Sequence, residues 1–458
     1  MVQRDRPPLT PVPVADPMRE SGAVLLISCY ELGHQPLGIA WASAFLHRAG
    51  FFPQVLDVSV EQLDHEKVQA ACVIGISVPM HTALRLGVRV AQRVRQLNPT
   101  CHICFFGLYA QLNQEFLLSS VADSVIGGEY EQALVSLVES LESHRPLEID
   151  GVTRPGRPQG PVLKRLPFPL PDRRLLPGFE RYAQLEHHGT RQFAGYVEAT
   201  RGCKHHCLHC PIPPVYGGRF FVIPREVVLE DIRRLVASGA RHITFGDPDF
   251  LNGPGHSLAI VRAMHQEFPE VTFDFTAKIE HILKDREPFP ELAASGCLFM
   301  VSAVESLSDE VLGHLHKGHS RKDVFEALGI LRQAEIALRP SWVAFTPWTT
   351  REDYLDMLEF VEQEGLVYHV DPVQYTIRLL IPPGSALLSH GAMQPFLRER
   401  DQANFYYRWE HPDSRMDALH ERVSQIVEEA TRQKEDAVVT FARIKRLGLE
   451  ALGITGVA

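Results

Sequence analysis

The sequence lacks the features that mark membrane and secreted proteins. Its 458 residues contain no apolar run near the roughly 18–20 residues that a membrane-spanning helix needs. The first twenty residues hold five prolines and no apolar signal-peptide core. Basic residues are also in deficit, since 46 Lys and Arg face 56 Asp and Glu, and phosphate backbones need clustered Lys and Arg. We therefore expect a cytoplasmic protein with no membrane and no nucleic-acid partner.

Cysteine is scarce, with eight in the chain, and the rest of the composition is ordinary for a globular protein. The 32 glycines and 33 prolines exclude collagen-like or low-complexity sequence. Disulfides are rare in a reducing cytoplasm, so a tight cysteine cluster there more often binds a metal or takes part in catalysis. Five cysteines are scattered, and we expect them to pack as small apolar side chains: Cys29, Cys72, Cys101, Cys104 and Cys297.

Two series of alternating strand and helix patterns divide the chain. The first, at 21–145, predicts a parallel sheet covered on both faces, and hence a Rossmann-like α/β domain. The second, at 191–394, contains six strand–helix units, too few for a complete eight-stranded barrel, and predicts a partial (β/α)6 barrel. The remaining segments are predicted as a disordered leader at 1–20, a Pro-rich extended linker at 146–190 and a helical C-terminal segment without strands at 395–458.

The strongest chemical signal is the cluster of Cys203, Cys207 and Cys210. Its spacing is C-x3-C-x2-C, and it directly follows a strand predicted at 195–200. The cysteines therefore lie at the carboxyl end of a strand, where α/β folds place their chemistry. Three thiolates can hold three irons of a 4Fe–4S cluster and leave the fourth iron open to a substrate or cofactor.

Zinc is the competing interpretation of this cluster. A structural zinc site takes four Cys or His ligands in a tetrahedron. The three cysteines with one nearby histidine make such a set, and the candidates are His205, His206 and His209. The spacing is unusual for zinc, however, and a second C-x-x-C pair is missing.

Residues 195–390 resemble the radical SAM superfamily. The superfamily's motif is C-x3-C-x-Φ-C with an aromatic Φ, and His209 stands at the Φ position here. The resemblance implies a 4Fe–4S cluster on Cys203, Cys207 and Cys210, whose open iron binds S-adenosylmethionine. One-electron reduction, by a partner such as flavodoxin or ferredoxin, then cleaves S-adenosylmethionine to a 5′-deoxyadenosyl radical.

The same resemblance implies the residues that contact S-adenosylmethionine. GDPDF (246–250) occupies the place of the superfamily's Gly-Gly-Glu element, and VSAVES (301–306) resembles the strand near the ribose and carboxylate. The last two strands, expected at 342–347 and 373–380, approach the adenine. The residues carried over are Gly246, Asp247, Asp249, Lys278, Ser302, Glu305, Pro347 and Pro382.

The amino-terminal domain resembles the cobalamin-binding domains found ahead of many radical SAM modules. Glycines at its strand-to-helix turns let the backbone approach a bulky ligand. Helix N-termini there can receive the phosphate of the cobalamin nucleotide tail. The Asp-x-His-x-x-Gly element is absent, since the corresponding loop reads DVSVEQLD (57–64), so no side chain of this loop is expected to ligate cobalt. The implied contacts are Gly33, His34, Pro36, Ser77, Gly107, Gly127, Gly128 and Glu129. The alternative is a degenerate domain that kept the fold and lost the ligand.

Together these resemblances imply an enzyme that methylates an unactivated carbon with cobalamin as methyl donor. A small-molecule substrate is favoured over a peptide. The alternatives are a cobalamin-independent radical SAM enzyme, forming C–S or C–C bonds or catalysing a rearrangement, and a non-catalytic zinc- or corrinoid-binding protein. The sequence identifies no catalytic side chain.

Overall fold

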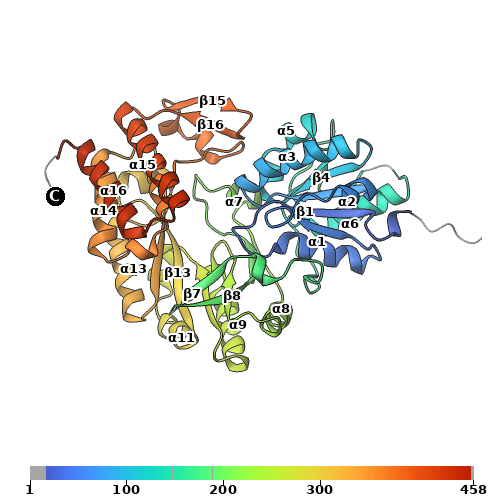
Figure 1. The fold of residues 1–458 in the computed structure, drawn as a ribbon, viewed down its shortest axis with the longest axis horizontal. Helices are drawn as coiled ribbons and strands as arrows, with labels where there is room; N and C mark the ends of the chain where they lie inside the picture. The colour runs from blue at the N-terminus through green and yellow to red at the C-terminus, as the bar shows by residue number, and fades with distance from the viewer. Residues whose placement is uncertain (1–16, 146–147, 188, 455–458) are drawn as a thin grey trace, which may run out of the picture.

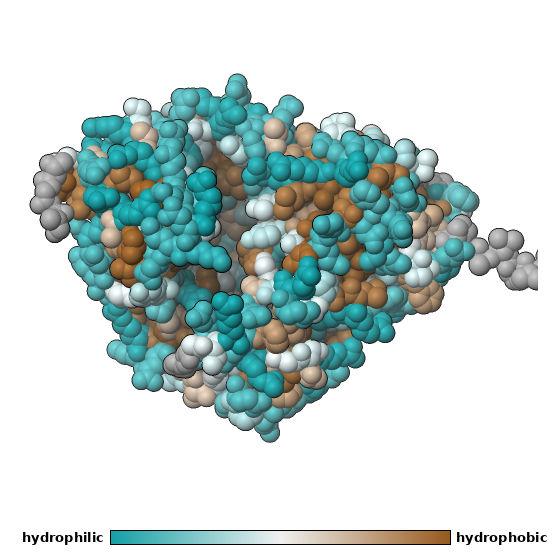
Figure 2. Space-filling model, viewed as in Figure 1, coloured by the Kyte–Doolittle hydropathy of each residue, from teal (hydrophilic) through white to brown (hydrophobic). Residues whose placement is uncertain are grey.

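The computed structural model describes residues 17–145, 148–187 and 189–454. Two lobes flank a central hollow (Figures 1 and 2). One lobe is the amino-terminal domain, and the other is formed by the end of a half-barrel and the C-terminal helices. Within the described ranges, no helix is both long and apolar enough to cross a membrane.

The amino-terminal domain is a six-stranded sheet in the order β2-β1-β3-β4-β5-β6. Its strands are β1 (Val24–Ser28), β2 (Gln54–Asp57), β3 (Val73–Ser77), β4 (His102–Phe106), β5 (Ser124–Ile126) and β6 (Val152–Thr153). The first five run parallel, and β6 is antiparallel to β5. The helices are α1 (Leu37–Arg48), α2 (His65–Ala70), α3 (His81–Leu97), α4 (Leu108–Leu112), α5 (Gln114–Ser120) and α6 (Glu131–Glu142).

Every residue of β1 and β3 is buried, because helices cover both faces of the sheet. The apolar sides of α1 and α6 pack on one face, and those of α3 and α5 pack on the other. The predicted Rossmann-like domain is confirmed.

The second sheet has the order β14-β13-β12-β11-β8-β7. Its strands are β7 (Gln184–His187), β8 (Thr190–Val197), β11 (His242–Phe245), β12 (Thr272–Thr276), β13 (Cys297–Glu305) and β14 (Ala337–Trp342). Five are parallel, and β7 is an antiparallel edge strand. The helices are α8 (Arg225–Ala237), α9 (Pro254–Glu267), α10 (Ile279–Lys284), α11 (Phe289–Ala294), α12 (Asp309–Leu315), α13 (Arg321–Gln333) and α14 (Arg351–Gln363). This curled sheet confirms the predicted partial barrel.

Three local predictions were wrong. The strand expected at 342–347 lies five residues earlier, as β14. The strand expected at 373–380 is a 3-10 helix, Pro372–Thr376, followed by a single bridge between Phe345 and Arg378. The C-terminal segment, expected to lack strands, contains the hairpin β15 (Leu397–Asp401) and β16 (Tyr406–Trp409) before α15 (Ser414–Gln433) and α16 (Ala437–Ala451).

This hairpin ties the C-terminal segment to the amino-terminal domain. Phe405, in the hairpin turn, is buried in the core of that domain, with its ring 4.9 Å from the ring of Phe116. The carbonyl of Asn404 lies 2.7 Å from Nε2 of His81. The turn therefore bridges the two lobes.

Most of the predicted linker is ordered, and it joins both domains through Arg173. The guanidinium pairs with Asp231 of α8 and donates to the carbonyl of Tyr196 in β8 and to Oε1 of Gln35. The predicted leader at 1–20 lies mostly outside the described residues, which begin with a 3-10 helix at Pro17–Arg19.

Candidate active site

The three cysteines lie in a loop at the carboxyl end of the half-barrel. Strand β9 (Thr200–Gly202) precedes the loop, helix α7 (Ile212–Tyr216) follows it, and β10 (Phe220–Val222) pairs antiparallel with β9. Gly202 has a φ of 75°, and a Cβ there would lie 2.5 Å from the carbonyl oxygen of Arg219. Only glycine allows this close turn into the cluster loop.

Cys203 and Cys207 are buried, and Cys210 is partly buried. Burial raises the pKa of Cys203, and it raises the pKa of Cys210 to about 12. Such thiols stay protonated at neutral pH unless a bound metal stabilises the thiolates. The loop therefore favours metal-bound cysteines over free nucleophiles.

The spacing of the thiols fits a cluster better than one zinc ion. Four ligands about 2.3 Å from a single zinc bring sulfur atoms within about 4 Å of each other. Among the described residues, no group of three ligand atoms mutually within 4.8 Å includes these cysteines. His209, one of the candidate zinc ligands, instead lies with Nε2 3.2 Å from Oε1 of Glu305. The three thiols are therefore not gathered around one metal atom, which disfavours a single zinc ion on these ligands.

Asp247 holds the strand that leads into the cysteine loop. It accepts hydrogen bonds from the backbone N–H of Ala199 at 3.0 Å and from the hydroxyl of Thr200 at 2.6 Å. Burial raises the pKa of this carboxyl to about 7. The carboxyl of Asp247 therefore accepts hydrogen bonds from the protein itself, and these bonds position β9.

Asp249 centres a buried polar cluster beside the loop. Its carboxylate accepts from Nδ1 of His281 at 2.9 Å and from the backbone N–H of Lys278 at 3.3 Å, and it lies 3.5 Å from Nε2 of His205. The Lys278 ammonium lies 3.3 Å from Nδ1 of His205 and donates to Glu280 at 3.0 Å. Burial alone would raise the pKa of Asp249, but its histidine partners more than offset this and lower it. The cluster fixes His205 within the cysteine loop.

Glu305 ends β13 with a φ of 65°, a left-handed backbone conformation that non-glycine residues rarely adopt. Its Oε1 lies 3.2 Å from both Nε2 of His209 and Nζ of Lys317. Burial alone would raise the pKa of Glu305, but Lys317 and His209 outweigh it and lower the pKa to about 2. The carboxylate is therefore ionised beside the cysteine loop.

The remaining predicted S-adenosylmethionine contacts serve the fold in this structure. The Ser302 hydroxyl donates to the carbonyl of Ala277 at 2.8 Å. Pro347 is buried in a turn in which the Thr346 and Thr349 side chains bond to each other. Pro382 is buried, and its carbonyl accepts from the backbone N–H of Ser385.

The carboxyl edges of the two sheets face each other. Four predicted residues line one cavity between them: Ser77, Gly107 and Gly128 from the amino-terminal domain, and Gly246 from the barrel. Glu31 also lines this cavity, and its buried Oε1 has no hydrogen-bond partner. Burial raises the pKa of Glu31 to about 8, so this carboxyl can donate as well as accept. The sequence analysis did not single out Glu31.

Glu129 and the two preceding glycines contact other parts of the chain. A Cβ at Gly128 would lie 2.2 Å from the carbonyl oxygen of Val162 in the linker, and one at Gly127 would lie 2.3 Å from Oε1 of Gln111. Glu129 accepts from the Tyr216 hydroxyl at 3.0 Å and lies 3.7 Å from Nη1 of Arg201. These three residues thus form the interface between the domains and the linker.

The first loop of the amino-terminal domain reaches the barrel. Gly33, with a φ of 78°, accepts at its carbonyl from Ala183 of the linker. His34 stacks on Tyr196 of β8, with ring centroids 4.8 Å apart. Pro36 is the N-cap of α1. The structure therefore places His34 on the barrel sheet rather than against its own domain's sheet.

The residues of the interdomain edge suit a large polar ligand, but the space between the domains is small. The edge offers the backbone of Gly107 and, at Glu31, a buried Oε1 without a hydrogen-bond partner, while Oε2 accepts from the backbone N–H of Leu37 at 2.9 Å. The cavity measures about 140 Å³, whereas pockets for ligands commonly measure about 300–1,000 Å³. A corrin ring therefore needs more space than this cavity provides.

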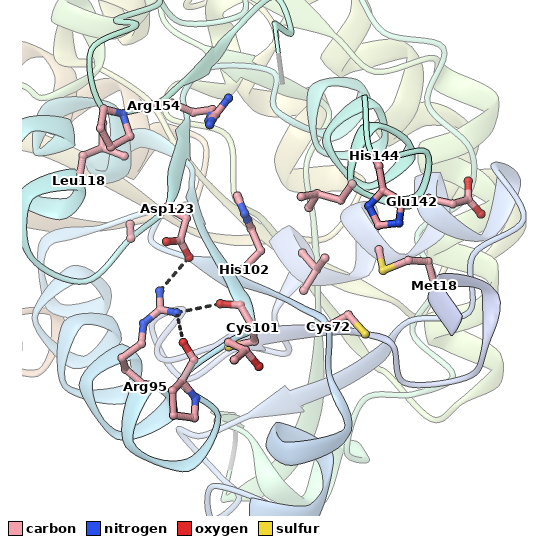
Figure 3. A pocket seen from close by; sticks show the side chains of 16 residues that line it. Met18, Cys72, Arg95, Cys101, His102, Leu118, Asp123, Glu142, His144 and Arg154 are labelled. Atoms are coloured by element: carbon pink, nitrogen blue, oxygen red, sulfur yellow. Dashed lines mark hydrogen bonds and ion pairs between the residues drawn. The ribbon is translucent and has the colours of Figure 1, made fainter. Parts of the chain in front are cut away.

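A cavity of about 950 Å³ lies at the opposite, amino edge of the first sheet (Figure 3). Arg95 lines this cavity, pairs with Asp123 and donates to the carbonyls of Pro99 and Cys101. Chemistry in parallel sheets is placed at carboxyl edges, so this cavity is not assigned to the active site.

The fold and the cysteine loop together define a two-domain iron–sulfur protein. Comparison with known families specifies it further: residues 197–361 match the radical SAM superfamily, and residues 23–138 match the B12 binding domain. The chain therefore contains a radical SAM domain preceded by a B12-binding domain. The cofactors of these families are a 4Fe–4S cluster, S-adenosylmethionine and cobalamin.

Curated relatives share this two-domain span. The hopanoid C-3 methylase of Methylococcus capsulatus is 26% identical over 69% of this chain and 62% of its own length. This chain therefore spans less than two thirds of that relative. An anaerobic magnesium-protoporphyrin IX monomethyl ester cyclase of Synechocystis is 23% identical over 74% of this chain and 69% of its own.

Two solved structures share the fold. The radical S-adenosylmethionine methyltransferase TsrM from Kitasatospora setae, with cobalamin and a [4Fe-4S] cluster bound, has a TM-score of 0.60 at 16% identity over 76% of this chain and 74% of its own. The cobalamin-dependent enzyme OxsB, in its apo form, has a TM-score of 0.71 at 14% identity over 93% of this chain and 71% of its own.

Sequence reasoning missed two buried cations, Arg201 and Lys317. Arg201 stands two residues before Cys203, at the end of a predicted strand, and a charged residue there should have indicated a buried partner. Lys317 lies just past α12, where the sequence shows no pattern that links it to Glu305.

Proposed function

We propose that this enzyme reductively cleaves S-adenosylmethionine and methylates an unactivated carbon of a small molecule in a cobalamin-dependent reaction. The observation that carries the proposal is the facing of two carboxyl edges, with the cysteine loop on one and the glycine-rich edge of a B12-binding domain on the other. The related hopanoid C-3 methylase and TsrM are named for methylation, which supports the same outcome.

Cys203, Cys207 and Cys210 would hold the cluster, which when bound supplies the electron that cleaves S-adenosylmethionine. The chain's own residues position this loop. Asp247 fixes the strand before it, and Asp249 fixes His205 inside it. The ionised Glu305 fixes His209, so the loop is held on both sides.

A one-electron donor such as flavodoxin or ferredoxin would reduce the cluster. Reduced donors of this kind and intact thiols belong to a reducing compartment, so we place the protein in the cytoplasm.

The test is an anaerobic assay of protein reconstituted with iron and sulfide. Dithionite and S-adenosylmethionine are added, and 5′-deoxyadenosine is quantified by mass spectrometry. We expect about four irons per chain and product from the wild-type protein, and neither from Cys207→Ala. Bound zinc without iron, or equal product from the variant, would contradict the proposal. Cys297→Ala, at a buried cysteine remote from the loop in sequence, is the matched control.

A further inference from the structure

The inner face of the half-barrel is polar, whereas the outer face packs on the helices. Register places Tyr196 beside Thr244, and Thr244 beside Asp274, on neighbouring strands. Paired residues of neighbouring strands share a face. The opposite face carries the core residues Ile243, Phe273 and Leu338. A polar inner face needs either partners from the protein or a polar ligand.

Arg339 lies on this face without an ion pair among the described residues. Val301 and Arg339 are register neighbours, and the guanidinium lies over the ring of Phe299, with Cζ 3.7 Å from the ring centroid. Within the described ranges Arg339 makes no hydrogen bond and has no carboxylate within 4.0 Å, and its Nε is buried without a partner. Burial lowers the pKa of Arg339. Arg339 is half-buried, and a partly desolvated cation without an ion pair gains from pairing with an anionic ligand.

Two further buried polar atoms without a partner lie on or against β8, which is separated from β14 by three strands of the sheet. Gln192, four residues before Tyr196 on β8, lies on the same face, and its Oε1 is buried without a partner. His34 stacks on Tyr196, and its Nδ1 is also buried and unpartnered. Unsatisfied polar atoms thus occur toward both sides of the inner face, and Arg339 is the cation among them.

The nearby acid does not neutralise Arg339. Asp274 accepts from Nε2 of His242 at 2.7 Å and from the hydroxyl of Thr244 at 2.6 Å, both at Oδ1. Its charge disfavours a second negative charge on a ligand. The face therefore suits a monoanion better than a phosphate dianion.

We propose that the inner face binds the substrate's carboxylate group, with Arg339 as the residue that recognises it. Since the guanidinium makes no hydrogen bond within the protein, its in-plane N–H groups can make a bidentate contact with a planar carboxylate. Arg339 is three residues before the carboxyl end of β14, or roughly 10 Å along the strand. The carbon that reacts near the cysteine loop is then several bonds from the carboxylate. This inference deepens the proposed function and rests on it for the identity of the ligand as substrate.

Binding tests the inference without turnover. The probes are 4-phenylbutyrate, its primary amide and 4-phenylbutylphosphonate, titrated by calorimetry into the reconstituted holoenzyme without reductant. We expect the carboxylate to bind at least tenfold more tightly than the amide or phosphonate. We expect Arg339→Gln to weaken carboxylate binding at least tenfold, and Arg339→Lys to retain part of it.

The matched control is Arg332→Gln. Arg332 is an exposed residue of the outer helix α13, and it pairs with Glu364. This variant should bind the carboxylate as the wild type does. Arg339→Gln should keep the wild-type melting temperature, because Arg339 has no polar partner to lose. Failure of the wild type to bind the carboxylate, equal binding by Arg339→Gln, or preference for the phosphonate would overturn the inference.

The two proposals fail separately. Cys207→Ala, which should lose the cluster, should still bind 4-phenylbutyrate with an affinity that depends on Arg339. Carboxylate binding without any S-adenosylmethionine cleavage would remove the proposed reaction and leave the anion site. Cleavage of S-adenosylmethionine without Arg339-dependent carboxylate binding would remove the anion site and leave the proposed reaction.

Discussion

Arg201 joins the barrel to the amino-terminal domain, and its removal should weaken that interface in a pH-dependent way. The guanidinium is almost fully buried and pairs with Glu131 and Glu198, while Glu129 lies 3.7 Å away. Aromatic rings surround it, with Cζ 4.9 Å from the centroid of Phe168. Arg201→Met keeps most of the volume and removes the charge.

The expected loss is large because two buried carboxylates lose their cation. Removing one member of a buried ion pair costs about 3–5 kcal/mol. Burial raises the pKa of Glu129 to about 7 even with Arg201 present, and Arg201 acts to lower it. In the variant the pKa of Glu129 rises further. A carboxyl whose pKa is higher in the folded than in the unfolded protein stabilises the fold fully below its unfolded pKa of 4.5. This contribution is lost as the pH rises through the pKa of the folded state. The deficit should therefore be small at pH 5 and clearly larger at pH 8.

Guanidinium unfolding at pH 5 and pH 8, with hydrogen exchange at 127–131 and 198–202, measures this effect. The control is Arg201→Met combined with Glu129→Gln and Glu131→Gln, which leaves no buried charge without a partner at these sites and should recover most of the stability. A deficit below about 1 kcal/mol, the same deficit at both pH values, or no recovery in the triple variant would refute the reasoning.

Three further predictions follow from the geometry. The pKa of Glu305 falls from 4.5 to about 2, so its ion pair contributes about 3 kcal/mol above pH 4.5 that is lost as pH falls toward 2. Glu305→Gln should flatten this acid dependence in unfolding curves of the cluster-free protein, and an unchanged slope would contradict the assignment. Phe405→Ala should release the β15–β16 hairpin, because a Phe to Ala change in a core costs about 3–5 kcal/mol. Limited proteolysis should then cut within 397–409, with exposed Phe325→Ala as the control. Resistance equal to that of the wild type would argue against docking of Phe405. Hydroxocobalamin should increase the radius of gyration in small-angle scattering, because the interdomain cavity of about 140 Å³ must open; a bound corrin with no expansion would show that it binds elsewhere.

The cysteine loop illustrates what local sequence can specify. Three thiols within eight residues, placed after a strand, already define a cluster site, because the chain itself keeps them close. The structure adds how the loop is held. Asp249 lies in the loop after β11 and Glu305 ends β13, and their partners His281 and Lys317 are more than ten residues away from them in sequence.

His34 shows how a residue predicted to contact cobalamin also makes a contact outside its own domain. The loop that carries it resembles a cobalamin-binding element, and a contact with cobalamin was the natural prediction. In the fold the loop extends to the barrel, where the ring stacks on Tyr196. No pattern within either domain encodes that contact, because it depends on how the two domains pack.

The sequence by itself determined the two α/β domains and the three cluster cysteines, because hydrophobic periodicity and short spacings are local properties. Only the tertiary structure decided three further features: the burial of Arg201 between the domains, the docking of Phe405 into the opposite lobe, and the unpaired charge of Arg339 on the inner face. The physical reason is the same in each case. These side chains gain or lack partners that are distant in sequence, and such pairings leave no periodic or spacing signal in the chain.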